Sequence, residues 1–266
     1  MKRVFSTCVL IAIVLSGFVN EVVRARANNF AYTALVQRGG VAVRFTPRQI
    51  REANRKLRYT IKARYPQAVG AVRDARLTKL NRELRQLVTA EVAEFKSYFQ
   101  TPEERQGPTG SYYESTYWVN LATNNLVSIG FGVSTYGEGA AHPNHNTMVF
   151  NYDLSLGRTL TLSDLFKPNS NYLDAISRYT IEELKKKLGP DPDTEWIERG
   201  AGAKEENYKS WNLTKSGLQI TFDPYQVASY AEGEHVVVIP YSVLQSLINP
   251  EGPLPDITTQ PKGLKR

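Results

Sequence analysis

The 266-residue sequence predicts an α+β fold in which an antiparallel β-sheet is packed by two long α-helices, as a single globular domain or two tightly joined subdomains. Two segments place apolar residues three or four positions apart, which is typical of amphipathic helices. Other segments are rich in aromatic and β-branched residues and are separated by turn residues, which is typical of strands. With 41% hydrophobic residues, the chain can bury a sizeable core.

The amino terminus has the three parts of a secretory signal. Lys2 and Arg3 give it a positive start, residues 4–19 are apolar, and Ala25-Arg26-Ala27 offers a small-residue cleavage site. The apolar stretch falls short of the roughly 20 residues that a bilayer requires, so we favour cleavage over an uncleaved anchor. Residues 1–27 are therefore predicted to be a signal peptide, and the product to be exported, periplasmic or extracellular, without a stable membrane span.

Cysteine and charge limit the function further. Cys8 is the only cysteine and leaves with the predicted signal, which excludes disulfides and cysteine-ligated zinc from the mature chain. Residues 28–99 carry 15 Lys+Arg against 5 Asp+Glu, whereas residues 100–266 carry 14 against 20. In an exported protein, such a basic half suits anionic envelope polymers, lipid surfaces or its own acidic half better than nucleic acid.

The first predicted elements lie in and after a basic segment, residues 28–57. Thr46-Pro47 resembles a helix start, so a helix is predicted in this segment, followed by a strand over 59–65 that Pro66 ends. A helix of about 25 residues begins near Arg73. Its predicted buried stripe is Leu77, Leu80, Leu84, Leu87, Val88, Val92, Phe95 and Phe99.

The middle of the chain is predicted to be rich in strands. Strands over 112–121 and 126–133 flank a turn at Thr123-Asn124-Asn125, and a third strand covers 147–152. The second long helix is predicted over 171–188, where Gly189-Pro190 stops it.

The last third is predicted to begin with a mobile polar loop, 191–208, containing one helical turn at Trp196. A hairpin of 211–213 and 218–222, a buried strand over 236–239 and a final helix from Pro240 follow. Residues 249–266 are rich in Pro, Gly and Thr and are predicted to be a disordered tail. The folded domain should cover 58–248, with 58–135 and 136–248 as possible subdomains.

The segment from Tyr136 to Asn146 contains His142 and His145 close to Glu138. Imidazole and carboxylate groups can ligate zinc, but a zinc site needs three or four protein ligands and His235 is far along the chain. A loop ordered by hydrogen bonds to its backbone is the commoner outcome of such a sequence. We therefore predict no metal and no cofactor.

A second specialised segment runs from Thr221 to Gly233. Thr221-Phe222-Asp223 resembles the opening of a polysaccharide deacetylase motif, but Pro224 stands where those enzymes need a second aspartate, so we reject that assignment. Tyr225 and Tyr230 have aromatic bodies with polar tips, suited to stacking on sugars or anchoring a protein partner. The alternative is a structural loop whose tyrosines hydrogen-bond into the sheet. No serine-triad, P-loop or dinucleotide motif occurs in the sequence.

Taken in order, several motifs resemble a family of bacterial extracytoplasmic domains shared by the sensing domain of the anti-sigma factor RsiV and the non-catalytic amino-terminal half of the peptidoglycan deacetylase PdaC. The resemblance covers about residues 58–248, and Ala140 departs from it by standing where the family commonly has glycine. The matching pieces include Tyr65-Pro66-Gln67, Ala141-His142-Pro143-Asn144, Asn151-Tyr152-Asp153-Leu154, Asp164-Leu165-Phe166, Leu213-Thr214, Phe222-Asp223-Pro224-Tyr225 and Tyr230-Ala231.

This resemblance implies an α+β fold with a central antiparallel sheet and an exported, non-enzymatic envelope module that binds or senses. We expect only the binding module, without the sigma-binding segment of RsiV or the catalytic domain of PdaC. The ligand class it implies is a lysozyme-like muramidase or cell-wall glycan. The acidic residues 100–266 would attract a basic lysozyme. The residues expected to contact the ligand are His142, Asn144, Asp223, Tyr225 and Tyr230.

Two other functions stay open at this stage. The first is a metal-dependent cell-wall glycan hydrolase or deacetylase that uses His142, His145 and either Glu138 or Asp223. The second is a structural envelope protein that its basic residues 28–99 hold to an anionic polymer, with binding that depends steeply on salt.

Overall fold

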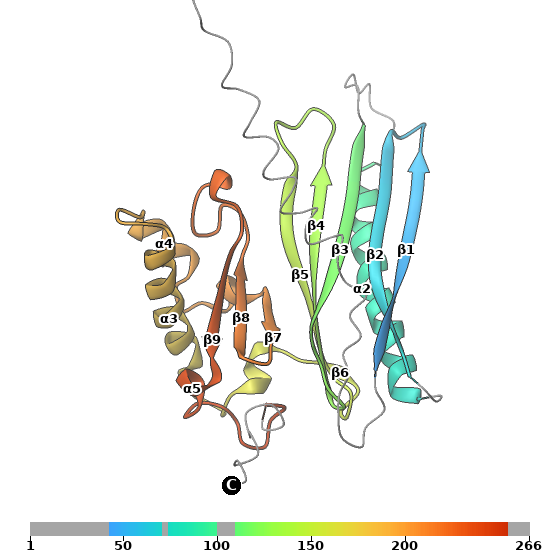
Figure 1. Cartoon of the computed structure of the whole chain (residues 1–266). Helices are drawn as coiled ribbons and strands as arrows, with labels where there is room; N and C mark the ends of the chain where they lie inside the picture. The colour runs from blue at the N-terminus through green and yellow to red at the C-terminus, as the bar shows by residue number, and fades with distance from the viewer. Residues whose placement is uncertain (1–42, 71–73, 100–109, 255–266) are drawn as a thin grey trace, which may run out of the picture. The chain divides into compact units, whose positions relative to one another are not determined.

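The computed structural model describes residues 43–70, 74–99 and 110–254, all of which belong to one compact unit, Thr33–Arg266. The predicted signal peptide and residues 255–266 lie outside the described residues. The fold is α+β, as predicted, with one six-stranded sheet and one three-stranded sheet (Figure 1). None of the helices in the described ranges combines the length and apolar character needed to cross a membrane.

The six strands of the large sheet lie side by side in chain order: β1 (Arg44–Asn54), β2 (Tyr59–Val69), β3 (Ser111–Ala122), β4 (Leu126–Tyr136), β5 (Asn144–Asp153) and β6 (Arg158–Thr159). All neighbouring pairs are antiparallel except β2 and β3, which are parallel. The sheet is therefore mixed, and the predicted antiparallel sheet is corrected at this pair. A helix connects β2 to β3, and such a crossover returns the chain in the same direction.

The predicted helix in the segment 28–57 is wrong, because β1 occupies Arg44–Asn54 and forms a hairpin with β2. Pro47 lies opposite Pro66 in this hairpin. β1 is an edge strand, and β3 pairs with β2 from Tyr59 to Ala63 only. Pro47 and Pro66 therefore lie where only one neighbouring strand is present. Proline is tolerated there because no second strand needs a hydrogen bond from its missing N–H.

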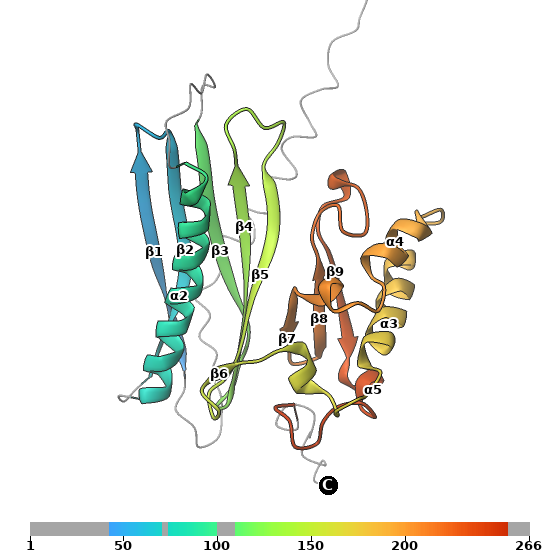
Figure 2. The ribbon, with the colours of Figure 1, turned by 180° about the vertical axis from the view of Figure 1, so that it is seen from behind.

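The first long helix is confirmed as α2 (Ala75–Ser97). Asp74 caps it by accepting a hydrogen bond from the Arg76 N–H at 2.8 Å. α2 runs along one face of the large sheet (Figure 2), and Leu80, Leu84 and Val88 are fully buried between them. The predicted apolar stripe is thus core.

The strands β3, β4 and β5 confirm the predicted hairpin and third strand. β4 and β5 are paired along their lengths, from Leu126 opposite Asp153 to Thr135 opposite Asn144. The suggested subdomain boundary between residues 135 and 136 therefore falls inside one sheet. Two hydrophobic clusters exist instead. The first contains buried residues between Val43 and Leu154, and the second contains those from Leu160 onward together with Leu121 and Leu126.

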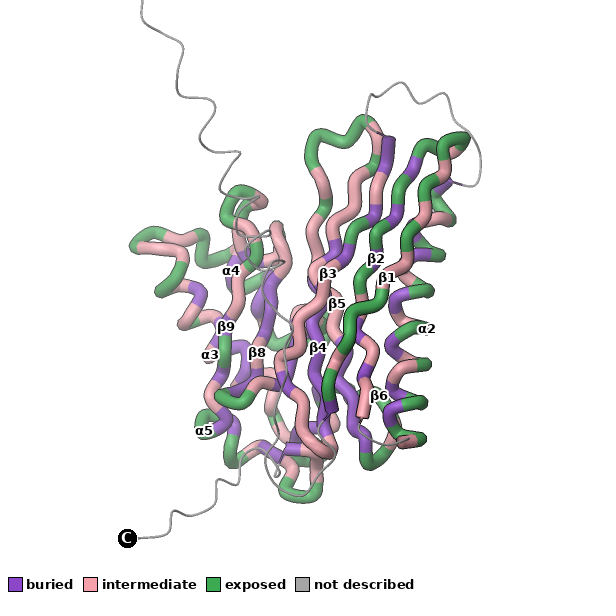
Figure 3. Tube along the Cα trace, turned by 45° about the vertical axis from the view of Figure 1, so that its right-hand side comes forward, coloured by how far each residue is buried: buried purple, intermediate pink, exposed green. Residues whose placement is uncertain are grey.

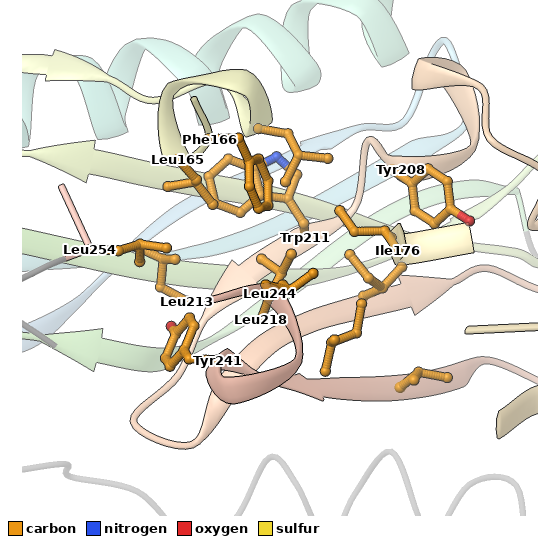
Figure 4. Packing of buried hydrophobic residues seen from close by; sticks show 14 of the residues in the cluster. Leu165, Phe166, Ile176, Tyr208, Trp211, Leu213, Leu218, Tyr241, Leu244 and Leu254 are labelled. Carbon is orange, nitrogen blue, oxygen red and sulfur yellow. The ribbon is translucent and has the colours of Figure 1, made fainter. Parts of the chain in front are cut away.

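The second cluster surrounds the small antiparallel sheet of β7 (Trp211–Leu213), β8 (Gly217–Phe222) and β9 (His235–Pro240). The second long helix is confirmed as α3 (Tyr172–Lys187), but it packs against this sheet and not against the sheet that α2 covers. Figure 4 shows the shared core, to which the short elements also contribute. These are η1 (Leu162–Leu165), α4 (Thr194–Gly200), η2 (Glu205–Tyr208) and α5 (Tyr241–Leu244). A further short element, η3 (Tyr230–Glu232), has no buried residue.

Two segments predicted to be mobile are ordered parts of this core. In the segment 191–208, Ile197 of α4 is fully buried, and the Tyr208 hydroxyl reaches the Ala201 carbonyl. After α5, Ile248 bridges to Phe166, and Leu254 is 1% exposed. The predicted disordered tail is therefore wrong for residues 249–254.

A buried polar network joins the two sheets. Asn212 of β7 donates through Nδ2 to the Ser128 hydroxyl of β4 at 3.0 Å and to the Ile129 carbonyl at 3.1 Å. Asn151 of β5 donates to the Trp211 carbonyl at 2.8 Å and accepts from the Ser128 hydroxyl at 2.7 Å. Ser128, Asn151 and Asn212 are all buried. Figure 3 colours the buried stretches of the strands purple.

Candidate functional site

Three of the residues predicted to contact a ligand come together from two segments. His142 lies in the β4–β5 loop, whereas Tyr225 and Tyr230 lie in the segment that joins β8 to β9. The His142 ring stacks on the Tyr230 ring with 4.0 Å between centroids, and the Tyr225 ring lies 5.4 Å from Tyr230. We call these three residues the aromatic cluster.

Hydrogen bonds hold the polar ends of the aromatic cluster. The Tyr230 hydroxyl donates to the Pro143 carbonyl at 2.8 Å. His142 Nδ1 lies 2.9 Å from the same carbonyl, and His142 Nε2 lies 3.4 Å from the Tyr225 hydroxyl. A carbonyl only accepts, so in the neutral ring Nδ1 carries the proton and Nε2 accepts from Tyr225. Each loop is therefore bonded to the other.

Tyr225 has an unusual backbone. Its φ of 71° lies in the left-handed region, which is rare for a bulky residue, and the residue is 53% exposed. The Trp196 indole N–H holds the Tyr225 carbonyl at 3.0 Å, and the Gln226 amide donates to the Gly200 carbonyl at 3.0 Å. The fold therefore fixes a strained conformation that presents an aromatic ring to solvent.

Sequence reasoning missed this supporting role of α4. Gly200 ends α4, and a Cβ built there would lie 1.8 Å from the Gln226 carbonyl oxygen. Only glycine allows α4 and the Tyr225 segment to approach so closely. Trp196 was the one local clue to this role of α4. The sequence predicted a helical turn at Trp196 but did not predict its hydrogen bond to Tyr225.

Asp223 has a structural contact as well as a place beside the aromatic cluster. Its Oδ1 accepts a hydrogen bond from the Thr147 N–H of β5 at 2.8 Å, so it links the segment after β8 to the large sheet. Burial is the main reason that the pKa of Asp223 is raised to about 6; the hydrogen bonds to Thr147 oppose this rise, and the charge of Glu234 adds to it. Asp223 therefore ties the segment that carries Tyr225 to the large sheet.

Asn144, the fifth residue predicted to contact a ligand, begins β5 opposite Thr135 and is exposed. Among the described residues, its side chain makes no hydrogen bond, and no contact draws it into the aromatic cluster. It lies two residues from His142 along the chain, on the rim of the same loop.

The residues named for a metal-dependent enzyme are arranged differently. His145 lies 6.2 Å from the Tyr230 ring, and burial lowers its pKa. Glu138 pairs with Arg58, whose Nη2 lies 2.6 Å from Oε1, and the Glu138 side chain is only 3% exposed. Within the described ranges, no three His, Asp, Glu or Cys residues are grouped as they would be around a metal ion. The His142 and His145 rings both lie against the Tyr230 ring, an arrangement that the sequence did not predict.

One stretch in the carboxy-terminal part of the described chain matches a known family. Residues 163–242 match the family described as "Protein of unknown function (DUF3298)". We refer to this matched stretch, residues 163–242, as the DUF3298 domain. In this structure, the DUF3298 domain begins in η1, ends in α5 and contains the small sheet, so Tyr225 and Tyr230 belong to it and His142 does not.

Similar proteins extend the likeness beyond this domain. The chain is 26% identical over 170 residues to the peptidoglycan-N-acetylmuramic acid deacetylase PdaC of Bacillus subtilis, covering 64% of this chain and 36% of PdaC. It is 24% identical over 110 residues to the immunogenic protein MPT64 of Mycobacterium tuberculosis, covering 41% of this chain and 47% of MPT64. The chain therefore spans less than half the length of these relatives.

Two crystal structures of DUF3298 family members share the fold. The protein from Bacteroides fragilis has a TM-score of 0.54 at 17% identity, and the match covers 80% of this chain and 96% of that one. The protein from Pseudomonas aeruginosa has a TM-score of 0.50 at 14% identity with the same coverage. Since the match includes 80% of this chain, the large sheet belongs to the shared fold together with the DUF3298 domain.

Proposed function

We propose that this protein is an exported, non-enzymatic binding module of the bacterial cell envelope and that its aromatic cluster recognises cell-wall glycan. One observation carries the proposal: Tyr225 is held in a left-handed backbone conformation and the residue is 53% exposed. Such strain costs on the order of 1–3 kcal/mol and is concentrated at binding and catalytic sites. A tyrosine that only completed the core would need neither the strain nor the exposure.

The chemistry of the cluster suits a carbohydrate. Aromatic rings with polar tips offer an apolar face to a sugar ring and a hydrogen-bonding edge to its hydroxyls. Tyr230 and His142 stack within 4.0 Å, and Tyr225 lies beside them with its hydroxyl directed at His142. Because the two loops are bonded to each other before a ligand arrives, little conformational entropy is lost when it binds.

Similarity to PdaC supports a place in the cell wall. That protein is named a peptidoglycan-N-acetylmuramic acid deacetylase, and the match covers 36% of it. We transfer to this chain the wall environment and not the deacetylation. Two carboxylates of the segments that form the cluster already bond to other parts of the chain: Glu138 to Arg58, and Asp223 to Thr147.

A lysozyme-like muramidase is the second candidate ligand, and the charge near the cluster favours it. Glu232 and Glu234 are exposed and follow Tyr230 closely in the chain. The charge of Glu234 acts on both His145 and Asp223, which places it near the cluster. Acidic side chains around aromatic anchors would speed the encounter with a basic protein and make binding sensitive to salt.

The test measures binding of the purified protein to protein-free peptidoglycan by co-sedimentation and to lysozyme by calorimetry. We expect Tyr225→Ala and Tyr230→Ala each to weaken binding about tenfold or more. Tyr98→Ala is the matched control, because Tyr98 is 70% exposed at the end of α2. The proposal fails if both cluster variants fold normally and every affinity stays at the wild-type value. Loss of lysozyme binding alone would assign the cluster to the muramidase.

A further inference from the structure

A second candidate site lies at the edge of β5, where the large sheet meets α2 and β7. A cavity of about 650 Å³ opens there, within the range of small-ligand sites. Its lining includes Arg82 and Leu87 of α2, Val149 of β5, Leu160, Lys209 and Trp211. None of the residues of the aromatic cluster contributes to it.

Most of the outward edge of β5 is already bonded. The Thr147 N–H donates to Asp223, and the Thr147 carbonyl accepts from the Ser210 hydroxyl at 3.0 Å. Further along, the Asn151 carbonyl accepts from the Leu160 N–H at 2.8 Å. Successive odd-numbered residues of an antiparallel strand direct their N–H and C=O groups to the same side. The N–H and C=O of Val149, between Thr147 and Asn151, therefore point out of the sheet at the cavity.

These two groups of Val149 have no hydrogen-bond partner among the described residues. β6 pairs with β5 only at Tyr152 and Asp153, so it does not reach them. An edge with one open donor and one open acceptor can exchange a pair of hydrogen bonds with one residue of an extended peptide.

Two cations stand on different walls of this cavity. Arg82 is exposed on α2 and Lys209 is exposed just before β7, and in the described part of the chain neither forms an ion pair. Glu83, the acid that also lines the cavity, lies 3.5 Å from the Tyr152 hydroxyl. The cavity therefore presents two unpaired positive charges beside an open backbone edge.

We infer that the cavity binds a short acidic peptide in extended form. One peptide residue pairs with the Val149 backbone, and carboxylates on either side of it reach Arg82 and Lys209. The apolar rings of the lining do not favour a sugar, because Trp211 is 5% exposed and Phe150 is 4% exposed, so neither offers a ring face for stacking. This inference does not rest on the proposed function of the aromatic cluster.

The probe is acetyl-Ala-Glu-Ala-Glu-Ala-amide, compared with the same peptide carrying Gln for Glu, in NMR titrations of the full protein. We expect the acidic peptide to bind at least tenfold more tightly, and the double variant Arg82→Gln/Lys209→Gln to lose about tenfold or more in affinity. The matched control is Arg85→Gln/Lys204→Gln, which removes two exposed cations outside the cavity and should leave the affinity unchanged.

A third variant tests the backbone pairing. Val149→Pro removes the N–H that points away from β4 and no hydrogen bond to β4, which an edge position tolerates, and should weaken binding while the thermal melt stays cooperative. Equal binding of the two peptides, an equal loss in the control double variant, or binding of N-acetylmuramic acid in place of the peptide would each overturn the inference. Tyr225→Ala should leave peptide binding intact, so failure of this site and failure of the aromatic cluster are separable.

Discussion

The buried network between the sheets gives a sharp stability prediction for Asn212, which is 0% exposed. Asn212→Ala removes the Nδ2 bonds at 3.0 Å to Ser128 and 3.1 Å to Ile129. Each bond is worth about 1 kcal/mol, and the smaller side chain leaves a void. Asn212 Oδ1 is buried without a partner, so its removal returns about 1 kcal/mol. The expected net loss in the free energy of unfolding is therefore about 1–3 kcal/mol.

Guanidinium denaturation followed by fluorescence and circular dichroism measures this loss. Asn212→Asp should cost more than Asn212→Ala, because it replaces the donor by a buried carboxylate that faces the Ile129 carbonyl. Asn144→Ala is the matched control on exposed β5 surface and should change the free energy by less than about 0.5 kcal/mol. The reasoning is refuted if Asn212→Ala is as neutral as the control, or if the aspartate variant is no less stable than the alanine variant.

Three further predictions concern the site and its support. Burial raises the Asp223 pKa to about 6 from an unfolded value near 3.8, so its contribution to stability is complete below about pH 4 and is lost as the pH rises to 6. The change is at most about 3 kcal/mol, less where water screens the carboxylate, and Asp223→Asn should abolish it in denaturant titrations from pH 4 to 7. Gly200→Ala should lower stability by about 1–3 kcal/mol or more and also weaken ligand binding, because its Cβ would collide with the Gln226 carbonyl; unchanged binding would contradict the coupling of α4 to Tyr225. Gly130→Ala should lower the melting temperature and shift the tryptophan emission, because its Cβ would lie 2.4 Å from the Trp118 ring.

The long periodic elements could be predicted from the sequence because their pattern is local. The stripe of α2 and the strands of the β3–β4 hairpin carry their own burial pattern, and both are confirmed. β1 could not be predicted in this way. Its segment contains Thr46-Pro47, a good helix start, but the hairpin with β2 decides the outcome, and pairing energy comes from residues distant in sequence.

The aromatic cluster shows the same limit on a smaller scale. The sequence singled out His142, Tyr225 and Tyr230 as unusual, and the structure brings their rings together. That they bind a ligand stays a prediction. The sequence could not indicate that Asp223 would accept a hydrogen bond from a strand of the other sheet, because Thr147 lies 76 residues away and carries no motif. A carboxylate that bonds a backbone N–H leaves a signal only in the fold.

Both proposed sites can be understood from the way β5 ends the long run of paired strands. An open strand edge invites pairing with other chains, and proteins cover it or interrupt it. Here β6 covers only the carboxy-terminal end of β5, and the DUF3298 domain supplies Asp223 and Ser210 to Thr147. The Asp223 contact also fixes the loop that carries Tyr225, so the same bond that blocks the edge positions the aromatic cluster. Neither β6 nor the DUF3298 domain bonds to Val149, so among the described residues the backbone of β5 stays open there. The Asp223–Thr147 hydrogen bond therefore separates two proposed sites: the aromatic cluster, which it positions, and the cavity at Val149.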